Sequence, residues 1–135
     1  MKIVLDAWAI LAYLQREEPA ATRVREVLRE AEVRQVEVFA SLINIGEVFY
    51  NIARRKGEHI AEETLEELRC LPLTILSPEP DTILKAARLK SRHALSYADA
   101  FAVVTAQELQ ATLLTGDPEI LQLTGVVTFE PLQRG

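Results

Sequence analysis

Short runs of apolar residues alternate in this chain with longer segments that carry a helical pattern. Residues 3–5 are apolar without interruption, which is typical of a strand buried on both of its faces. Val24, Val27, Leu28 and Ala31 follow the i, i+3, i+4, i+7 spacing of a helix with one apolar side. Because strands that alternate with helices form parallel sheets covered by helices on both faces, the pattern predicts an α/β fold.

The complete pattern predicts a mostly parallel central sheet of about five strands. The expected strands span residues 3–5, 36–40, 73–76, 111–114 and 126–129. The expected helices span residues 7–15, 19–32, 41–55, 58–71, 81–90 and 96–110, with a short one from Pro118. No repeat or linker interrupts the chain, and 135 residues are the size of one domain, so we expect a single domain over residues 1–135.

Composition excludes several classes of protein. Fifteen basic and 20 acidic residues give a net charge of −5, which argues against a protein that coats nucleic acid by positive charge alone. No apolar stretch approaches the ~20 residues that span a bilayer. The single cysteine, Cys70, excludes an internal disulfide and suits a reducing compartment. We therefore expect a cytoplasmic protein that does not bind a membrane, with Cys70 buried beside Leu68 and Leu71.

The chain has only four aspartates, and two of them follow predicted strands. Asp6 comes directly after the first strand, and Asp117 follows the fourth. Since parallel strands end at the same edge of their sheet, where ligands gather, we expect Asp6 and Asp117 to lie there together. Each also has a purely structural alternative, because Asp6 could cap the next helix and Asp117 precedes Pro118 as an ordinary N-cap would.

Two further acids lie in helical segments that are otherwise apolar. Glu47 is about two turns, roughly 9 Å, into the helix that is expected to begin at Ser41. Asp99 lies in the first turn of the helix that is expected to begin at Ser96. The structural alternatives are an ion pair of Glu47 with Arg54 and a capping box formed by Ser96 and Asp99.

Considered together, the four acids indicate a metal site. Clustered carboxylates without partners would repel one another, and some would have to stay protonated. A hard divalent cation removes that penalty, and ligands that are all oxygen suit Mg²⁺ or Mn²⁺. A pair of such ions about 4 Å apart can activate water and stabilise the leaving oxygen in phosphodiester cleavage. Zinc fits less well, because His59 and His93 stand alone and no pair of ligands has zinc spacing.

Four segments, in order, resemble the PIN-domain ribonucleases and, within that family, the stand-alone VapC-type toxins of toxin–antitoxin pairs. Residues 3–7 (IVLDA) are similar to the first strand and first acid of the family, and residues 41–48 (SLINIGEV) to the segment that carries its glutamate. Residues 96–102 (SYADAFA) are similar to its most diagnostic block, and residues 114–117 (LTGD) to its last. The resemblance covers nearly the whole chain and implies a single PIN-like nuclease domain.

The resemblance also implies roles for individual residues. Thr115 would support the metal site or a phosphate through its hydroxyl group. Trp8 departs from the family pattern, which often has a small polar residue two positions after the first aspartate. Its indole could stack on a base or line an interface, but the expected role is packing in the core. The implied metal ligands and catalytic residues of a Mg²⁺- or Mn²⁺-dependent endoribonuclease are Asp6, Glu47, Asp99 and Asp117.

Charge and resemblance together suggest partners. Four arginines adjoin the candidate ligands in sequence and could contact RNA phosphates, although each could equally be a solvated surface residue. The family implies a homodimer and a cognate antitoxin. The antitoxin could bind an apolar groove on the first helices, unless the apolar residues there are core: Ala12, Tyr13, Leu14, Val24 and Leu28. The four arginines are Arg54, Arg55, Arg88 and Arg92.

Two other functions remain open, and a third is disfavoured. A catalytically inactive PIN-like domain could bind RNA or protein, and a solitary nuclease could process RNA without an antitoxin. A phosphotransfer enzyme built on a similar sheet would need a second aspartate where Trp8 is found.

Overall fold

The computed structural model describes all 135 residues, Met1–Gly135, as five strands and seven helices. The strands are β1 (Lys2–Leu5), β2 (Glu37–Ser41), β3 (Thr74–Leu76), β4 (Thr112–Thr115) and β5 (Phe129–Pro131). The helices are α1 (Ala7–Leu14), α2 (Ala20–Glu32), α3 (Leu42–Lys56), α4 (Glu58–Arg69), α5 (Pro80–Arg92), α6 (Tyr97–Leu109) and α7 (Pro118–Leu121). None of these helices is both long enough and apolar enough to cross a membrane.

The five strands form one sheet in the order β3-β2-β1-β4-β5, and every neighbouring pair is parallel. The predicted α/β fold with a central sheet of five strands is confirmed. The chain first adds strands on one side of β1 and then, after β3, crosses to the other side to form β4. The order therefore switches between β1 and β4, the place where open α/β sheets bind ligands beyond the carboxyl ends of their strands.

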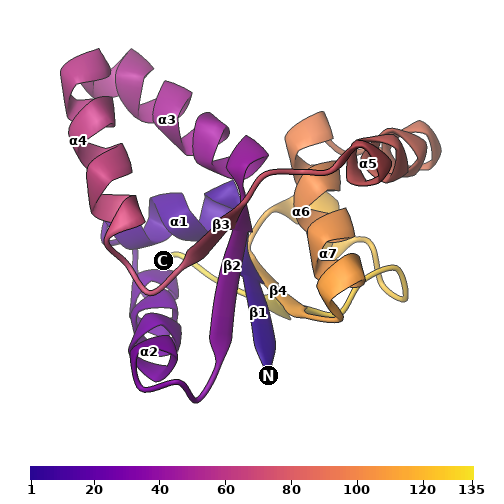
Figure 1. Cartoon of the computed structure of the whole chain (residues 1–135), viewed down its shortest axis with the longest axis horizontal. Coiled ribbons are helices and arrows are strands. Elements are labelled where there is room, and N and C mark those ends of the chain that lie inside the picture. The colour runs from indigo at the N-terminus through magenta and orange to yellow at the C-terminus, as the bar shows by residue number, and fades with distance from the viewer.

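Helices cover both faces of the sheet and enclose two hydrophobic cores. Helices α1 to α4 lie on one face, and α5, α6 and α7 lie on the other (Figure 1). Successive residues of β1 point to opposite faces, so Ile3 and Leu5 belong to the first core and Val4 to the second. All three side chains are fully buried, which explains why the sequence of β1 is apolar at every position.

The last strand lies farther along the chain than the sequence predicts. β5 begins at Phe129, whereas the expected strand over residues 126–129 is mostly a turn. In that turn the N–H of Val126 donates to the carbonyl of Leu123 at 3.1 Å, and Gly125 has a φ of +82°. Val126 is apolar because it packs against the second core, not because it lies in a strand.

Cys70 is exposed, so the prediction that it is buried is wrong. It ends α4, two residues after the buried side chain of Leu68. Two helical positions are about 200° apart around the axis, so Cys70 points away from the core that Leu68 enters.

Candidate metal centre

The candidate ligands leave the sheet at the point where its strand order switches. Leu5 of β1 pairs with Leu114 of β4, so the residues after these two strands emerge side by side. Asp6 follows β1 directly, and Asp117 follows β4 after Thr115 and Gly116. The expectation that these two aspartates share an edge of the sheet is confirmed.

Asp6 caps a helix and also presents a free carboxylate oxygen. Its Oδ1 accepts a hydrogen bond from the N–H of Ala9 at 2.8 Å, which begins α1. Its Oδ2 is buried and has no hydrogen-bond partner, and the residue is 1% exposed. Burial, reinforced by the charges of Asp117 and Glu47, raises the pKa of Asp6 to about 7. The capping role explains one oxygen and leaves the other available to a ligand.

Asp99 is held in the first turn of α6 with its carboxylate uncommitted. Its backbone N–H donates to Ser96 Oγ at 3.1 Å, so Ser96 is the N-cap of α6. Asp99 is 6% exposed, and burial followed by the charge of Asp117 raises its pKa to about 8. A capping box would also require the Asp99 carboxylate to accept from the backbone of Ser96, and no such bond is present.

Glu47 faces the same region from α3. Its Oε1 is buried without a hydrogen-bond partner, and burial together with the charge of Asp117 raises its pKa. The alternative ion pair with Arg54 is absent, because the Arg54 guanidinium lies over the ring of Tyr50, 4.9 Å from its centroid. Glu47 is therefore not a solvated surface acid.

Asn44 is a buried polar residue that sequence reasoning missed. Its side chain is 0% exposed, and its Nδ2 donates to the carbonyl of Ala98 at 3.0 Å, which ties α3 to the residue before Asp99. Its Oδ1 has no partner. The sequence feature that could have identified Asn44 is its position three residues before Glu47, which places both side chains on one face of α3.

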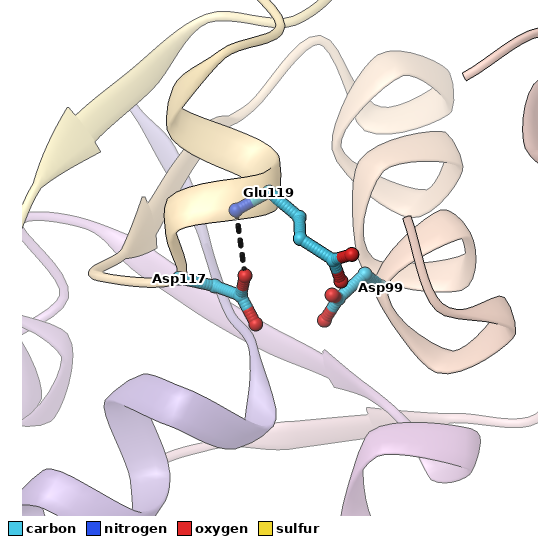
Figure 2. Close-up of side chains that lie close together, drawn as sticks. All are labelled: Asp99, Asp117 and Glu119. Atoms are coloured by element: carbon cyan, nitrogen blue, oxygen red, sulfur yellow. Dashed lines mark hydrogen bonds between the residues drawn. The ribbon is translucent and has the colours of Figure 1, made fainter. Parts of the chain in front are cut away.

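Asp117 and its neighbour Glu119 complete the acidic group. Asp117 Oδ1 accepts from the N–H of Glu119 at 2.9 Å, so Asp117 is the N-cap of α7, as its structural alternative predicts. Thr115 Oγ1 accepts from the N–H of Asp117 at 3.0 Å. Figure 2 shows the carboxylates of Asp117 and Glu119 beside that of Asp99, and one oxygen of each lies within 4.8 Å of the other two. Glu119 was not predicted, because an acid in the first turn of a helix is common.

These carboxyls form one electrostatic unit that no cation of the chain neutralises. The charge of Asp117 raises the pKa of each of the other three predicted ligands, and only hydrogen bonds from uncharged groups oppose the rise. Asp6 and Asp99 are buried and Glu47 and Asp117 are partly buried. Acids that repel one another in such a setting, with free oxygens and no arginine or lysine among them, fit a hard divalent cation.

The sequence profile of the PIN domain matches residues 3–126, which is most of the chain. The chain belongs to the PIN domain family. A search of curated proteins finds no match.

Solved structures share the fold of this PIN domain at low sequence identity. VapBC2 from Rickettsia felis, bound to a DNA fragment from its promoter, matches with a TM-score of 0.76 at 14% identity, over 98% of this chain and 100% of that one. VapC20 of Mycobacterium tuberculosis, described as a sarcin-ricin loop cleaving toxin, matches with a TM-score of 0.72 at 15% identity, over 90% and 95% of the two chains. FitAcB from Neisseria gonorrhoeae matches with a TM-score of 0.69 at 21% identity, over 96% and 97%.

The four predicted RNA-binding arginines lie on two helices of this PIN domain. All four are exposed, and none forms an ion pair with an acid. Three of them also lie in the last turn of a helix, where a positive charge is favourable without any ligand. Arg54 and Arg55 end α3, and Arg88 and Arg92 lie on α5.

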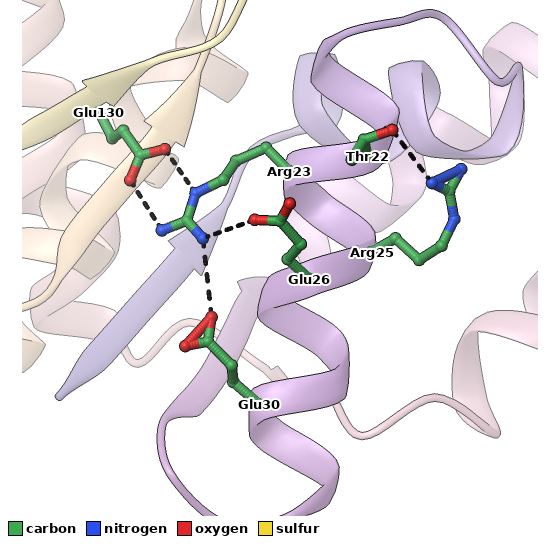
Figure 3. A network of polar contacts seen from close by, with 6 residues as sticks. All are labelled: Thr22, Arg23, Arg25, Glu26, Glu30 and Glu130. Carbon is green, nitrogen blue, oxygen red and sulfur yellow. Dashed lines mark hydrogen bonds and ion pairs between the residues drawn. The ribbon is translucent and has the colours of Figure 1, made fainter.

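A second group of acids in this PIN domain differs from the candidate metal centre because it surrounds an arginine. Arg23 donates to Glu130 from Nε at 2.8 Å and from an Nη atom at 3.1 Å, which joins α2 to β5 (Figure 3). Glu26 and Glu30 also lie within ion-pair distance of its guanidinium. The guanidinium offsets part of the charge of these three acids and hydrogen-bonds to two of them, so this group stabilises the fold and does not require a metal.

Removing this arginine should cost measurable stability. We expect Arg23→Ala to lower the free energy of unfolding by about 1 kcal/mol, and less at high salt, because a two-bond pair is lost at a partly solvated site. Urea unfolding at two salt concentrations measures the loss. Arg25→Ala is the control, because Arg25 lies 3.7 Å from an exposed Glu18 and should change stability little. Equal effects of the two substitutions would contradict this role for Arg23.

Proposed function

We propose that this PIN domain is a Mg²⁺- or Mn²⁺-dependent endoribonuclease and the toxin of a type II toxin–antitoxin pair. One observation carries the proposal. Asp6, Glu47 and Asp99 have their pKa values raised by burial and by the charge of a fourth acid, Asp117, at the switch point of the sheet. Such a group is costly to the folded protein unless it binds a cation, and costly arrangements of this kind occur at functional sites.

Several carboxylates of the centre would together coordinate the cation. Asp6 and Glu47 offer buried oxygens without partners, and Asp99 and Asp117 face each other beside Glu119. When bound, the cation supplies the activation of water and the stabilisation of the leaving oxygen in phosphodiester hydrolysis. No side chain needs to act as a covalent nucleophile. Because the pKa values of Asp6, Glu47 and Asp99 are raised, loading the site would release protons.

The exposed arginines would hold the RNA backbone around this acidic centre. Arg54 and Arg55 extend from the helix that carries Glu47, and Arg88 and Arg92 lie on the helix that precedes α6. Contacts of this kind bind phosphates and carry no sequence information. They would explain how a chain of net charge −5 binds RNA, since the negative charge of the centre is offset by its cation.

Cleavage of a labelled single-stranded RNA tests the enzymatic part of the proposal. The purified protein should cut the RNA internally with Mn²⁺ or Mg²⁺ and should stop when excess EDTA is added. Cleavage that continues in EDTA would contradict metal dependence. Absence of cleavage of any RNA tested, with Mn²⁺ bound, would favour an inactive binding module.

A groove on the first face of the sheet supports the antitoxin as a partner. Ala12, Val24 and Leu28 are buried, so the main part of the predicted apolar surface is core. A groove of about 200 Å³ remains between α1, α3 and α4, with Leu14, Ile52 and Ile60 among its lining residues. An amphipathic antitoxin segment would place its apolar side in this groove.

A substitution in the groove tests the partner. We expect Ile60→Asp to leave RNA cleavage intact but to weaken neutralisation by the product of the adjoining reading frame, so that growth stops when both are expressed. Ile83→Asp on α5 is the matched control, because Ile83 is 39% exposed and Ile60 is 37% exposed. Neutralisation that survives Ile60→Asp would exclude the groove as the binding site of the antitoxin. Absence of an adjoining reading frame would favour a solitary RNA-processing nuclease.

The homodimer is part of the same proposal. Apolar side chains are exposed at the start of α3 and of α6, where Leu42 and Ile43 lie on the first and Tyr97 on the second. Light scattering of the purified chain should give twice the mass of one chain, 15.1 kDa. A monomer at micromolar concentration would contradict it.

A further inference from the structure

Trp8, the only tryptophan of the chain, lies against the loop that carries Asp117. A Cβ atom at Gly116 would overlap the benzo ring of the Trp8 indole, so only glycine fits at this position. Trp8 also packs against the first hydrophobic core, as expected. The contact with Gly116 is additional to core packing, and it joins the first turn of α1 to the loop after β4.

The rest of this loop is fixed by hydrogen bonds on both sides of Gly116. The carbonyl of Thr115 accepts from the N–H of Leu132 at 2.8 Å, and the hydroxyl of Thr115 accepts from the N–H of Asp117 at 3.0 Å. Gly116 itself has no side chain with which to hold its place. Contact with the Trp8 indole therefore limits the position of Gly116.

The C-terminal segment in turn holds the indole. The Arg134 guanidinium lies over the Trp8 ring, 5.0 Å from its centroid, and is paired with Glu17 at 3.0 Å. The N–H of Gly135 donates to the carbonyl of Glu18 at 2.8 Å. A cation over an indole is among the stronger contacts of this type, so Trp8 has little freedom to move away from Gly116.

We propose that Trp8 is a positioning residue of the metal centre. Asp6 caps α1 two residues before Trp8, and Asp117 directly follows Gly116. Contact between Trp8 and Gly116 thus sets how far the carboxylate after β4 lies from the carboxylate after β1. The inference rests on the proposed function, because it concerns the affinity of the same centre for its cation.

Substitution of the indole gives the first test, with Mn²⁺ as the probe and calorimetry as the measurement. Trp8→Ala should weaken Mn²⁺ binding by about tenfold or more, as loss of residues that orient metal ligands does. Trp8→Phe loses the part of the ring that contacts Gly116 but still fills part of the space, so it should weaken Mn²⁺ binding less than Trp8→Ala does. Tyr13→Ala is the control for lost packing, because Tyr13 is also partly buried against the same core on α1. It should lower the Tm as Trp8→Ala does but leave Mn²⁺ affinity unchanged.

A double-mutant cycle gives a second test that does not depend on the alanine variant folding. Gly116→Ala should weaken Mn²⁺ binding, because its methyl group displaces the loop from the indole. Combining it with Trp8→Phe removes the overlapping part of the ring and should restore most of the affinity, so the two substitutions are not additive.

The outcomes separate this inference from the function on which it rests. If the wild type does not bind Mn²⁺, the proposed metal centre is wrong and the inference falls with it. If the wild type binds Mn²⁺ but Gly116→Ala binds it equally well, or Trp8→Phe gives no rescue, only the positioning role is overturned. The same holds if Tyr13→Ala weakens Mn²⁺ binding as much as Trp8→Ala.

Discussion

Asp99→Asn is expected to reduce Mn²⁺-dependent RNA cleavage by about 100-fold or more, since it removes a proposed ligand rather than a residue that orients one. The side chain keeps its size, and Ser96 still caps α6 through the backbone of residue 99, so the helix should form normally. The substitution also removes one of the repelling carboxyls. We therefore expect the variant, without metal at pH 8, to be more stable than the wild type.

Asp81→Asn is the matched control for this experiment. Asp81 is the one aspartate outside the candidate centre, and it lies exposed in the first turn of α5. Its replacement should change neither cleavage nor metal binding. The proposed chemistry would be contradicted if Asp99→Asn cleaved RNA as fast as Asp81→Asn.

The stability of the metal-free protein is expected to fall as pH rises from about 4 to about 8. The pKa values of Asp6 and Asp99 are raised from 3.8 to about 7 and about 8, so the folded state holds protons that the unfolded state releases. The folded protein is thus most stable below pH 4 with respect to these two groups and loses that contribution as they ionise. The total loss is on the order of a few kcal/mol.

Urea unfolding in EDTA at pH 5 and pH 8 measures this dependence. Other groups titrate over the same range, so the comparison with Asp99→Asn isolates the contribution of the centre: the variant should lose less stability between the two pH values. Mn²⁺ at pH 8 should restore the stability of the wild type by binding only the folded state. Equal pH dependence of the wild type and the variant would show that the pKa of Asp99 is not raised in the folded protein.

The strands and the acids that follow them could be predicted from local sequence, and the rule that parallel strands end at one edge of a sheet placed Asp6 and Asp117 together. The apolar run of β1 followed by Asp6 defines a buried strand and the residue at its end, and the parallel pairing of β1 with β4 then brings Asp117 to the same edge. The shift of β5 could not be predicted from apolar residues, since Val126 is apolar for its contact with the second core.

The rest of the site depends on contacts between distant segments. Asn44 is distinguished by its bond to Ala98 on another helix, and Glu119 by its approach to Asp99 across α6 and α7. Trp8 was expected in the core, and its second contact with Gly116 is visible only when the loop after β4 is in place. Sequence spacing places each of these residues on an element but does not bring two elements together.

The central claim is that Asp6, Glu47, Asp99 and Asp117 hold a divalent cation, and anomalous diffraction from crystals soaked in Mn²⁺ tests it most directly. The account predicts anomalous density within coordination distance of carboxylate oxygens from Asp6, Glu47, Asp99 and Asp117, and no such density in crystals of Asp99→Asn. Density elsewhere on the chain, or none at this edge of the sheet, would contradict the claim.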